Sequence, residues 1–230
     1  MKRFVLAAAL TLAAVSGAYA QGDWPSRPVK LIVNFPPGGP LVVLARSIGE
    51  VLQAQSKQPF VVETRAGPGD NNGADAVANA QPDGHTVLLG IDSTFTVNPH
   101  IYKSMAFKPA DLRPLVVMSS SGLLVGTNPS NGFKSLADLV AAGKGKGVSF
   151  SSAGSGSPGH LAAEMFTDAT GMKITHVPYK GNAPAVTAVL SGEVTGGVLA
   201  TPGMLPHVKA GKIAPLAVTS RQRSPLAPDV

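Results

Sequence analysis

The sequence predicts an α/β fold built from two successive series of strands and helices. Apolar runs rich in β-branched residues alternate with segments whose apolar residues recur at helical spacing. This alternation is typical of βαβ units with mostly parallel sheets. A break rich in Asn, Pro, Ser and Gly at residues 128–132 separates the two series.

The first series contains three strands and two helices. The strands are predicted at residues 29–35, 60–63 and 86–91, and the helices at residues 41–52 and 74–80. Apolar residues of the first helix fall on one face, as a core-facing helix requires: Leu41, Leu44, Ala45, Ile48 and Leu52. The turn Gln81-Pro82-Asp83-Gly84 stops the second helix, because its proline and glycine favour turn conformations.

The second series follows two strand-like runs at residues 115–127, which flank Gly122. Its strands are predicted at residues 148–152, 174–179, 194–199 and 213–219, and its helices at residues 136–142, 160–170, 184–191 and 205–210. We place a lobe boundary at the second of the two runs. The first lobe then spans residues 21–125, and the second spans residues 126–230.

Residues 1–20 are expected to be a cleaved signal peptide. Lys2 and Arg3 precede an apolar run, and Ala18-Tyr19-Ala20 matches the small-x-small pattern that signal peptidase cuts. The run is too short to be a membrane anchor, because a span takes about 20 apolar residues. The mature protein is therefore expected to begin at Gln21 and to reside in the periplasm.

Composition excludes several classes of function. The chain has no cysteine, so no disulfide, thiolate nucleophile or cysteine-based metal site can form. Its five histidines include no i, i+4 pair, and we expect neither a metal nor another cofactor. Removing Lys2 and Arg3 lowers the formal charge from +6 to +4. Since the basic residues form no cluster with aromatics, we expect no nucleic-acid binding.

Three glycine-containing turns ahead of predicted helices form the candidate site. The free N–H groups and the dipole of a helix N-terminus attract anions. The first turn contains Pro37, Gly38, Gly39, Pro40 and Leu41. The second contains Ser152, Gly154, Ser155, Gly156 and Ser157. The third contains Tyr179, Gly181 and Ala183, and Thr94 adds a side-chain donor. One such turn is an ordinary connection, but turns in both lobes predict an anion gripped between them.

The second turn also matches a dinucleotide-binding pattern. Gly154, Gly156 and Gly159 follow a predicted strand as G-x-G-x-x-G. That fold requires an acidic residue about 20 positions further on. The chain has Pro178-Tyr179-Lys180 there, so the pattern does not predict a dinucleotide site.

A secreted serine-type hydrolase is the main alternative function. Its nucleophile elbow has the pattern G-x-S-x-G. The nearest match, Ser155-x-Ser157-x-Gly159, lacks the first glycine. His160 next to this loop is the candidate base, although histidines at a helix start are usually structural. We therefore expect that the protein is not an enzyme.

The chain resembles the substrate-binding receptors of tripartite tricarboxylate transporters, the Bug or TctC family, over residues 24–230. The resemblance rests on these spaced motifs: Trp24-Pro25-Ser26-Arg27-Pro28, Phe35-Pro36-Pro37-Gly38-Gly39 with Ala45-Arg46, Pro82-Asp83-Gly84, Val97-Asn98-Pro99 with Tyr102, His176-Val177-Pro178-Tyr179-Lys180-Gly181, and Leu216-Ala217-Val218-Thr219-Ser220 with Arg223-Ser224-Pro225.

The resemblance implies a two-lobed periplasmic binding protein of the type II fold. Such receptors close on a small carboxylate and deliver it to the permease subunits of the transporter in the membrane. By resemblance, residues 37–41 and 152–157 clasp the carboxylate, with Thr94 and residues 179–183 nearby.

The chain departs from the family pattern at two places and at its end. Leu41 and Val42 stand where the family usually has Thr-Asp, and Val198-Leu199-Ala200 where many members have Phe-Asp-Asn. These departures predict a more apolar pocket and a carboxylate with an apolar tail. The family also continues past Val230 with a return strand to the first lobe. We therefore expect the first lobe to be incomplete, which leaves a nonfunctional truncated relative as a further alternative.

Overall fold

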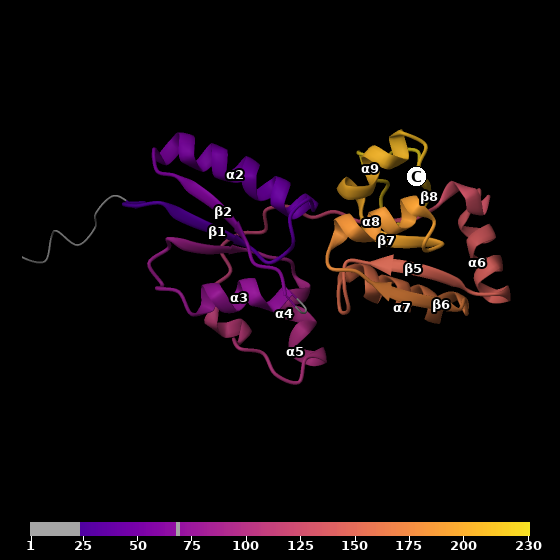
Figure 1. The fold of residues 1–230 in the computed structure, drawn as a ribbon, viewed down its shortest axis with the longest axis horizontal. Coiled ribbons are helices and arrows are strands. Elements are labelled where there is room, and N and C mark those ends of the chain that lie inside the picture. The colour runs from indigo at the N-terminus through magenta and orange to yellow at the C-terminus, as the bar shows by residue number, and fades with distance from the viewer. Residues whose placement is uncertain (1–23, 68–69) are drawn as a thin grey trace, which may run out of the picture.

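The computed structural model describes residues 24–67 and 70–230, so the predicted signal peptide lies outside the described residues. The described chain forms two lobes, each with its own sheet and helices (Figure 1). It passes from the first lobe to the second between residues 89 and 123. This arrangement confirms the predicted two-lobed α/β fold. No helix in residues 24–67 or 70–230 is long and apolar enough to cross a bilayer.

The first lobe has a three-stranded parallel sheet in the order β2-β1-β3. Its strands are β1 (Val29–Val33), β2 (Phe60–Thr64) and β3 (Thr86–Leu89). Helices α2 (Pro40–Ser56) and α3 (Asn71–Ala78) lie on opposite faces of the sheet (Figure 1). The short helices α4 (Ser93–Thr96) and α5 (Asn98–Ile101) and the 3-10 turn η2 (Pro109–Asp111) follow β3.

The central strand β1 has the continuous apolar run by which the first series could be predicted from the sequence. Parallel strands covered by helices on both faces carry continuous apolar runs. Leu31, Ile32 and Val33 of β1 are all buried. Beyond the strand, Phe35 packs with Val33 and with residues of α2, so the chain leaves the sheet directly into the first turn.

The second lobe has a five-stranded sheet in the order β6-β5-β7-β4-β8. Its strands are β4 (Leu123–Thr127), β5 (Val148–Ser152), β6 (Ile174–Pro178), β7 (Gly196–Ala200) and β8 (Ala214–Val218). Its helices are α6 (Leu136–Gly145), α7 (Pro158–Thr170), α8 (Asn182–Ser191) and α9 (Thr201–Lys209), with the 3-10 turn η3 (Pro129–Asn131) after β4.

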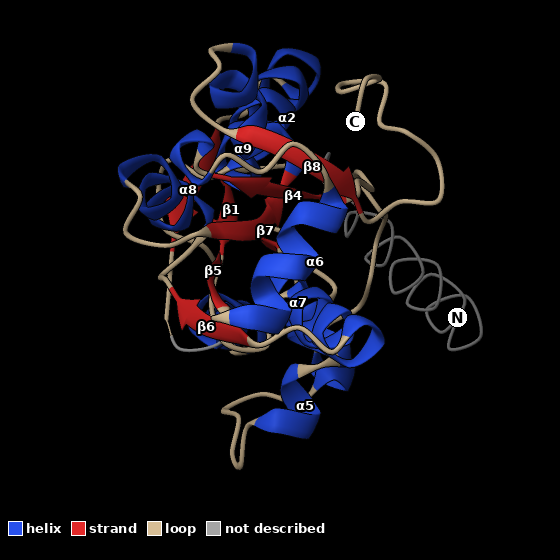
Figure 2. Ribbon diagram, turned by 90° about the vertical axis from the view of Figure 1, so that its right-hand side faces the viewer, coloured by secondary structure: helices blue, strands red, loops and turns tan. Residues whose placement is uncertain are grey.

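Two apolar cores cover the two faces of this sheet. Helices α6 and α7 lie on one face and α8 and α9 on the other (Figure 2). Successive strand residues alternate between the cores, as the pleat requires. Leu124 and Leu199 join the α8 and α9 side, whereas Val125 and Val198 join the α6 and α7 side.

The second lobe differs from the sequence prediction in three respects. Its sheet is mixed, because β4 runs antiparallel to β7 and β8. The predicted run before Gly122 is wrong: residues 115–118 are exposed, and none of the described strands pairs with them. All residues of β4 belong to the second sheet, so the predicted boundary between residues 125 and 126 falls inside a strand.

Candidate functional site

The three predicted turns lie where the two lobes touch. A β-carbon added to Gly38 of the first lobe would lie 3.6 Å from Cβ of Ala183 in the second. One added to Gly181 would lie 2.7 Å from Cγ of Pro36. Ala153, from the second turn, packs against the apolar cluster around Phe35. The described structure therefore brings the three turns together across the lobe contact.

The first turn ends β1 and begins α2. Gly38 has φ of +88°, a conformation that residues with side chains rarely adopt. Gly39 is the N-cap of α2 and Pro40 opens the helix, where a missing N–H costs nothing. No side chain caps this end, and the first helical turn carries no acidic residue. Pro37 and Gly38 are exposed, so an anion can approach the helix N-terminus.

The second turn runs from the end of β5 into α7. Ser157 is the N-cap of α7, and its hydroxyl accepts a 3.4 Å hydrogen bond from the backbone N–H of His160. Ser152 is buried, whereas Ser155 is exposed. Gly156 has φ of +79°, and a β-carbon there would collide with Cδ1 of Ile101 in the first lobe. This glycine therefore lets the second turn approach α5 closely.

The third turn joins β6 to α8 and is tied to the second. The N–H of Gly181 donates to the carbonyl of Ala153 over 3.0 Å. Helix α8 begins without a side-chain cap and without an acidic residue in its first turn. Its first residue, Asn182, accepts a 3.0 Å hydrogen bond from the N–H of Ala200, which fixes this helix end to the end of β7.

Two predicted site residues have hydroxyl groups that are already engaged. The hydroxyl of Tyr179 donates to Glu193 over 2.7 Å. Partial burial, together with this bond, raises the pKa of Tyr179 to about 12. The Thr94 hydroxyl is completely buried and accepts from the side-chain amide of Asn34. At Tyr179 and Thr94, a ligand would therefore meet backbone groups and not these hydroxyls. The two side chains would otherwise support the lobe contact from behind.

A polar network in the first lobe was not predicted from sequence. Asn34 donates to the carbonyl of Asp70 over 3.0 Å, and Asn98 donates to Oδ1 of Asn71 over 2.9 Å. Oδ1 of Asn98 lies 3.7 Å from the position of a β-carbon on Gly156, so the Asn98–Asn71 pair lies close to the second turn. An Asn-Pro pair is also an ordinary turn signal, so the sequence by itself does not mark Asn98 as a site residue.

Asp70, whose backbone carbonyl accepts from Asn34, is an ionisable residue beside these bonds. Burial raises the pKa of its carboxyl from 3.8 to about 7. Burial also raises the pKa of Tyr102, and the nearby Asp70 charge adds to the shift. Asp70 has φ of +60° and does not cap α3 with its side chain. The carboxyl is therefore held in a partly apolar position, where its neutral form is favoured.

The hydrolase alternative requires an exposed serine that is paired with a histidine base. The described residues contain no such pair. The serine hydroxyl beside an imidazole is that of Ser152, 2.6 Å from Nε2 of His176, and Ser152 is only 1% exposed. Ser157 caps α7 instead. No group of three His, Asp or Glu side chains in the described chain is arranged to hold a metal ion.

The departures from the family pattern have a different structural meaning than predicted. Val42 is 2% exposed in the core of the first lobe, and Val198 and Leu199 are each 1% exposed in the cores of the second. The expectation that these side chains make the ligand pocket apolar is wrong, because they face the protein interior. Leu41 remains half-buried beside the first turn.

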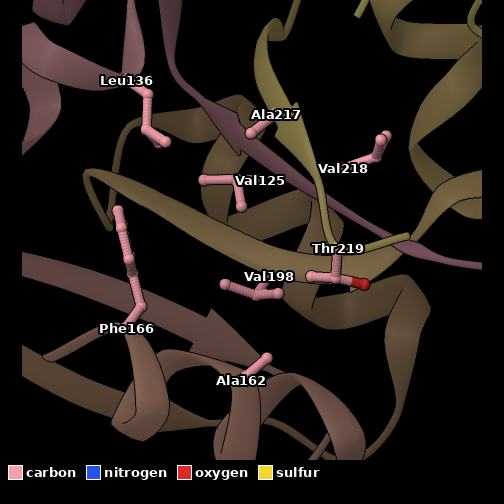
Figure 3. A pocket seen from close by; sticks show the side chains of 8 residues that line it. All are labelled: Val125, Leu136, Ala162, Phe166, Val198, Ala217, Val218 and Thr219. Atoms are coloured by element: carbon pink, nitrogen blue, oxygen red, sulfur yellow. The ribbon is translucent and has the colours of Figure 1, made fainter. Parts of the chain in front are cut away.

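A separate apolar pocket of about 170 Å³ lies on the α6 and α7 face of the second sheet (Figure 3). Its lining residues are Val125, Leu136, Ala162, Phe166, Val198, Ala217, Val218 and Thr219. None of the three turns contributes to it. With Thr219 as its single polar side chain, this pocket offers no charged partner for an anion.

Comparison with known proteins extends over both lobes. A family model described as the tripartite tricarboxylate transporter family receptor matches residues 44–230. Protein BugT of Bordetella pertussis (strain Tohama I) is 36% identical over 225 residues, covering 96% of this chain and 69% of BugT.

Two solved structures resemble the described fold. An R. palustris protein with adipate has a TM-score of 0.85 at 36% identity, covering 87% of this chain and 68% of that one. MatC from Rhodopseudomonas palustris, with bound malate, has a TM-score of 0.83 at 26% identity, covering 90% of this chain and 71% of that one.

Proposed function

The chain belongs to the tripartite tricarboxylate transporter receptor family, and we propose that it is an exported periplasmic receptor that closes on a small carboxylate and delivers it to the membrane permease of such a transporter. This family consists of solute-binding receptors and not of enzymes. The proposed work of the protein is reversible capture by hydrogen bonds and helix dipoles, without covalent change to the ligand.

The convergence of the three turns is the observation that carries this proposal. The N-termini of α2, α7 and α8 all lie at these turns, and none has an acidic residue in its first helical turn. An anion at a helix N-terminus gains about 0.3–1 kcal/mol, and up to about 2 kcal/mol in partly buried geometry. A carboxylate shared by these helix ends would therefore hold the two lobes together.

The ligand is proposed to be a small dicarboxylate. Adipate and malate, found with two related structures, are both of this class, and they differ in chain length and in the malate hydroxyl. Leu41 beside the first turn offers an apolar contact that suits a methylene chain. A hydroxyl group gains nothing from such a contact, so we expect a preference for adipate over malate.

A thermal melt with added ligand tests the proposal. The mature chain from Gln21 is melted alone and with adipate, malate, citrate or acetate, and with the neutral diamide of adipate as a matched control. A ligand at 100 times its Kd stabilises the folded state by about 2.7 kcal/mol, which corresponds to a rise in Tm of roughly 5–10 °C at this chain length.

The outcomes separate the three hypotheses. A receptor shows a cooperative transition that a carboxylate raises and the diamide does not. A hydrolase turns over ester substrates and loses that activity in Ser155→Ala or Ser157→Ala. Absence of any cooperative transition identifies a nonfunctional relative. A cooperative transition that none of the carboxylates shifts at millimolar concentration would overturn the receptor proposal.

A further inference from the structure

Two histidines of the second lobe stack directly behind the second turn. The rings of His160, in the first turn of α7, and His176, on β6, lie 3.9 Å apart with an interplanar angle of 17°. Neither side chain belongs to the anion-binding turns described above. Each nevertheless contacts one of those turns through a ring nitrogen.

His160 holds the glycine that faces the first lobe. The backbone N–H of Gly156 donates to Nδ1 of His160 over 3.1 Å. Accepting this bond requires an unprotonated Nδ1, so the proton of the neutral ring lies on Nε2. Nε2 in turn lies 3.4 Å from Oε1 of Glu164, one helical turn further along α7. The Gly156 contact therefore requires the neutral tautomer of His160 that carries its proton on Nε2.

His176 supports the start of the same turn. Its Nε2 lies 2.6 Å from the hydroxyl of Ser152, which also donates to the carbonyl of Gly154 over 3.0 Å and accepts from the Gly154 N–H over 3.2 Å. Burial lowers the pKa of His176, and the neighbouring His160 adds to this effect. This lowered pKa favours the neutral form of His176.

We propose that His160 is a positioning residue for the carboxylate-binding turn: neutral Nδ1 fixes the Gly156 peptide against the first lobe, and protonation breaks this contact and weakens ligand binding in acid. This inference rests on the proposed receptor function. A protonated Nδ1 and the Gly156 N–H are both donors, so they cannot remain bonded. The Gly156 peptide then loses the bond that holds it beside Ile101.

Other charged groups around the pair are few. Helix α7 packs on β5, β6 and β7, and of these strands only β6 carries an ionisable side chain, that of His176. On α7 itself, Glu164 faces His160. Asp168 lies a further turn along the helix. Histidine side chains in general gain a proton between about pH 5 and pH 8, which sets the pH range of the test.

Calorimetric titration with adipate, and in parallel with malate, tests the inference between about pH 6 and pH 8, where the ligand carboxylates remain ionised. In the native protein, affinity should fall about fivefold from pH 8 to pH 6, which is the loss expected for one hydrogen bond. His160→Asn keeps an acceptor near the Nδ1 position but does not titrate. It should keep the pH 8 affinity and lose the pH dependence.

Two further variants complete the test. His160→Leu removes the acceptor and should bind weakly at both pH values, with a melt confirming that it folds. His207→Asn, on α9, is the matched control and should retain the native pH profile. Native affinity that is constant or rises in acid overturns the inference while leaving the receptor function intact. If neither carboxylate binds at pH 8, the receptor function itself fails.

Discussion

The side-chain amide of Asn34 donates to the hydroxyl of Thr94 over 3.0 Å, and both side chains are completely buried. This bond links the residue after the C-terminal end of β1 to α4. The same amide donates to the carbonyl of Asp70. One asparagine thereby joins three segments of the first lobe behind the lobe contact.

Thr94→Val should destabilise the protein more than a surface substitution does. Valine has nearly the shape of threonine but cannot accept the Asn34 hydrogen bond, and a buried donor that loses a partner costs about 1–3 kcal/mol. Urea unfolding measures this change. Thr96→Val in the same helix is the control, because Thr96 is exposed. Equal unfolding free energies for the two variants would contradict the structural role of the bond.

The raised pKa of Asp70 predicts that the unfolding free energy of the protein falls as pH rises. Its pKa is raised from 3.8 to about 7, so between these values the folded state keeps a proton that the unfolded state releases. The unfolding free energy therefore decreases across this window, by at most about 1.4 kcal/mol per pH unit, and the loss is complete above the folded pKa.

Asp70→Asn should remove this pH dependence. Asparagine remains neutral and tolerates the positive φ of this position. In urea unfolding at pH 8, the variant should have a higher unfolding free energy than the native protein. At pH 5 this difference should be much smaller. The contrasting control is Asp138, whose pKa is lowered by hydrogen bonds from the Lys134 N–H and from Ser135, so its contribution is lost as pH falls. An Asp70→Asn advantage that is equal at both pH values would refute the assigned burial.

Gly181→Ala should weaken ligand binding more than it weakens folding. A β-carbon at Gly181 would lie 2.7 Å from Cγ of Pro36 and hold the lobes apart. Gly132→Ala is the matched control, because Gly132 also has a positive φ but no atom within 4 Å of an added β-carbon. Gly132→Ala should lose about 1–2 kcal/mol of stability because Gly132 has a left-handed conformation. Gly181→Ala should lose about 1–3 kcal/mol, because φ of +100° with ψ of 174° is a region that residues other than glycine rarely adopt. In calorimetric titration, only Gly181→Ala should also lose carboxylate affinity, by tenfold or more.

The strands and the glycine turns could be predicted because their signals are local. The apolar run of β1 and the glycines of the three turns report their own conformations without reference to the rest of the chain. The direction of β4 was not predictable in this way. A strand carries the same alternating pattern whether its neighbours run parallel or antiparallel, so only the pairing with β7 and β8 reveals it.

The polar contacts of the site were missed because they join residues far apart in sequence. Asn34 and Thr94 are 60 positions apart, and Ser152 and His176 are 24 positions apart. A lone asparagine after an apolar run, or a lone histidine in a strand, predicts no particular partner. Likewise, Leu199 stands where many family members have an aspartate, but only the fold shows that its side chain points into a core.

Leu41 and Val42 should respond in opposite ways to restoring polar side chains. Leu41 is half-buried at the first turn and packs at the margin of the first-lobe core, so Leu41→Thr introduces a hydroxyl there at the cost of part of this packing. A new hydrogen bond to a ligand hydroxyl is worth about 0.5–1.5 kcal/mol. Calorimetric titration should therefore show malate binding more tightly relative to adipate in Leu41→Thr than in the native protein.

Val42→Asp should instead unfold the first lobe. The Val42 side chain is 2% exposed and packs with Val33, Phe35 and Ala45, so a carboxylate there would be buried among apolar groups. Burial of an unpaired charge costs several kcal/mol, whereas Val42→Ala loses only the packing of its methyl groups. A melt should show a much larger loss for Asp than for Ala. If Val42→Asp folds normally and improves malate binding, Val42 faces the ligand and its placement in the core is wrong.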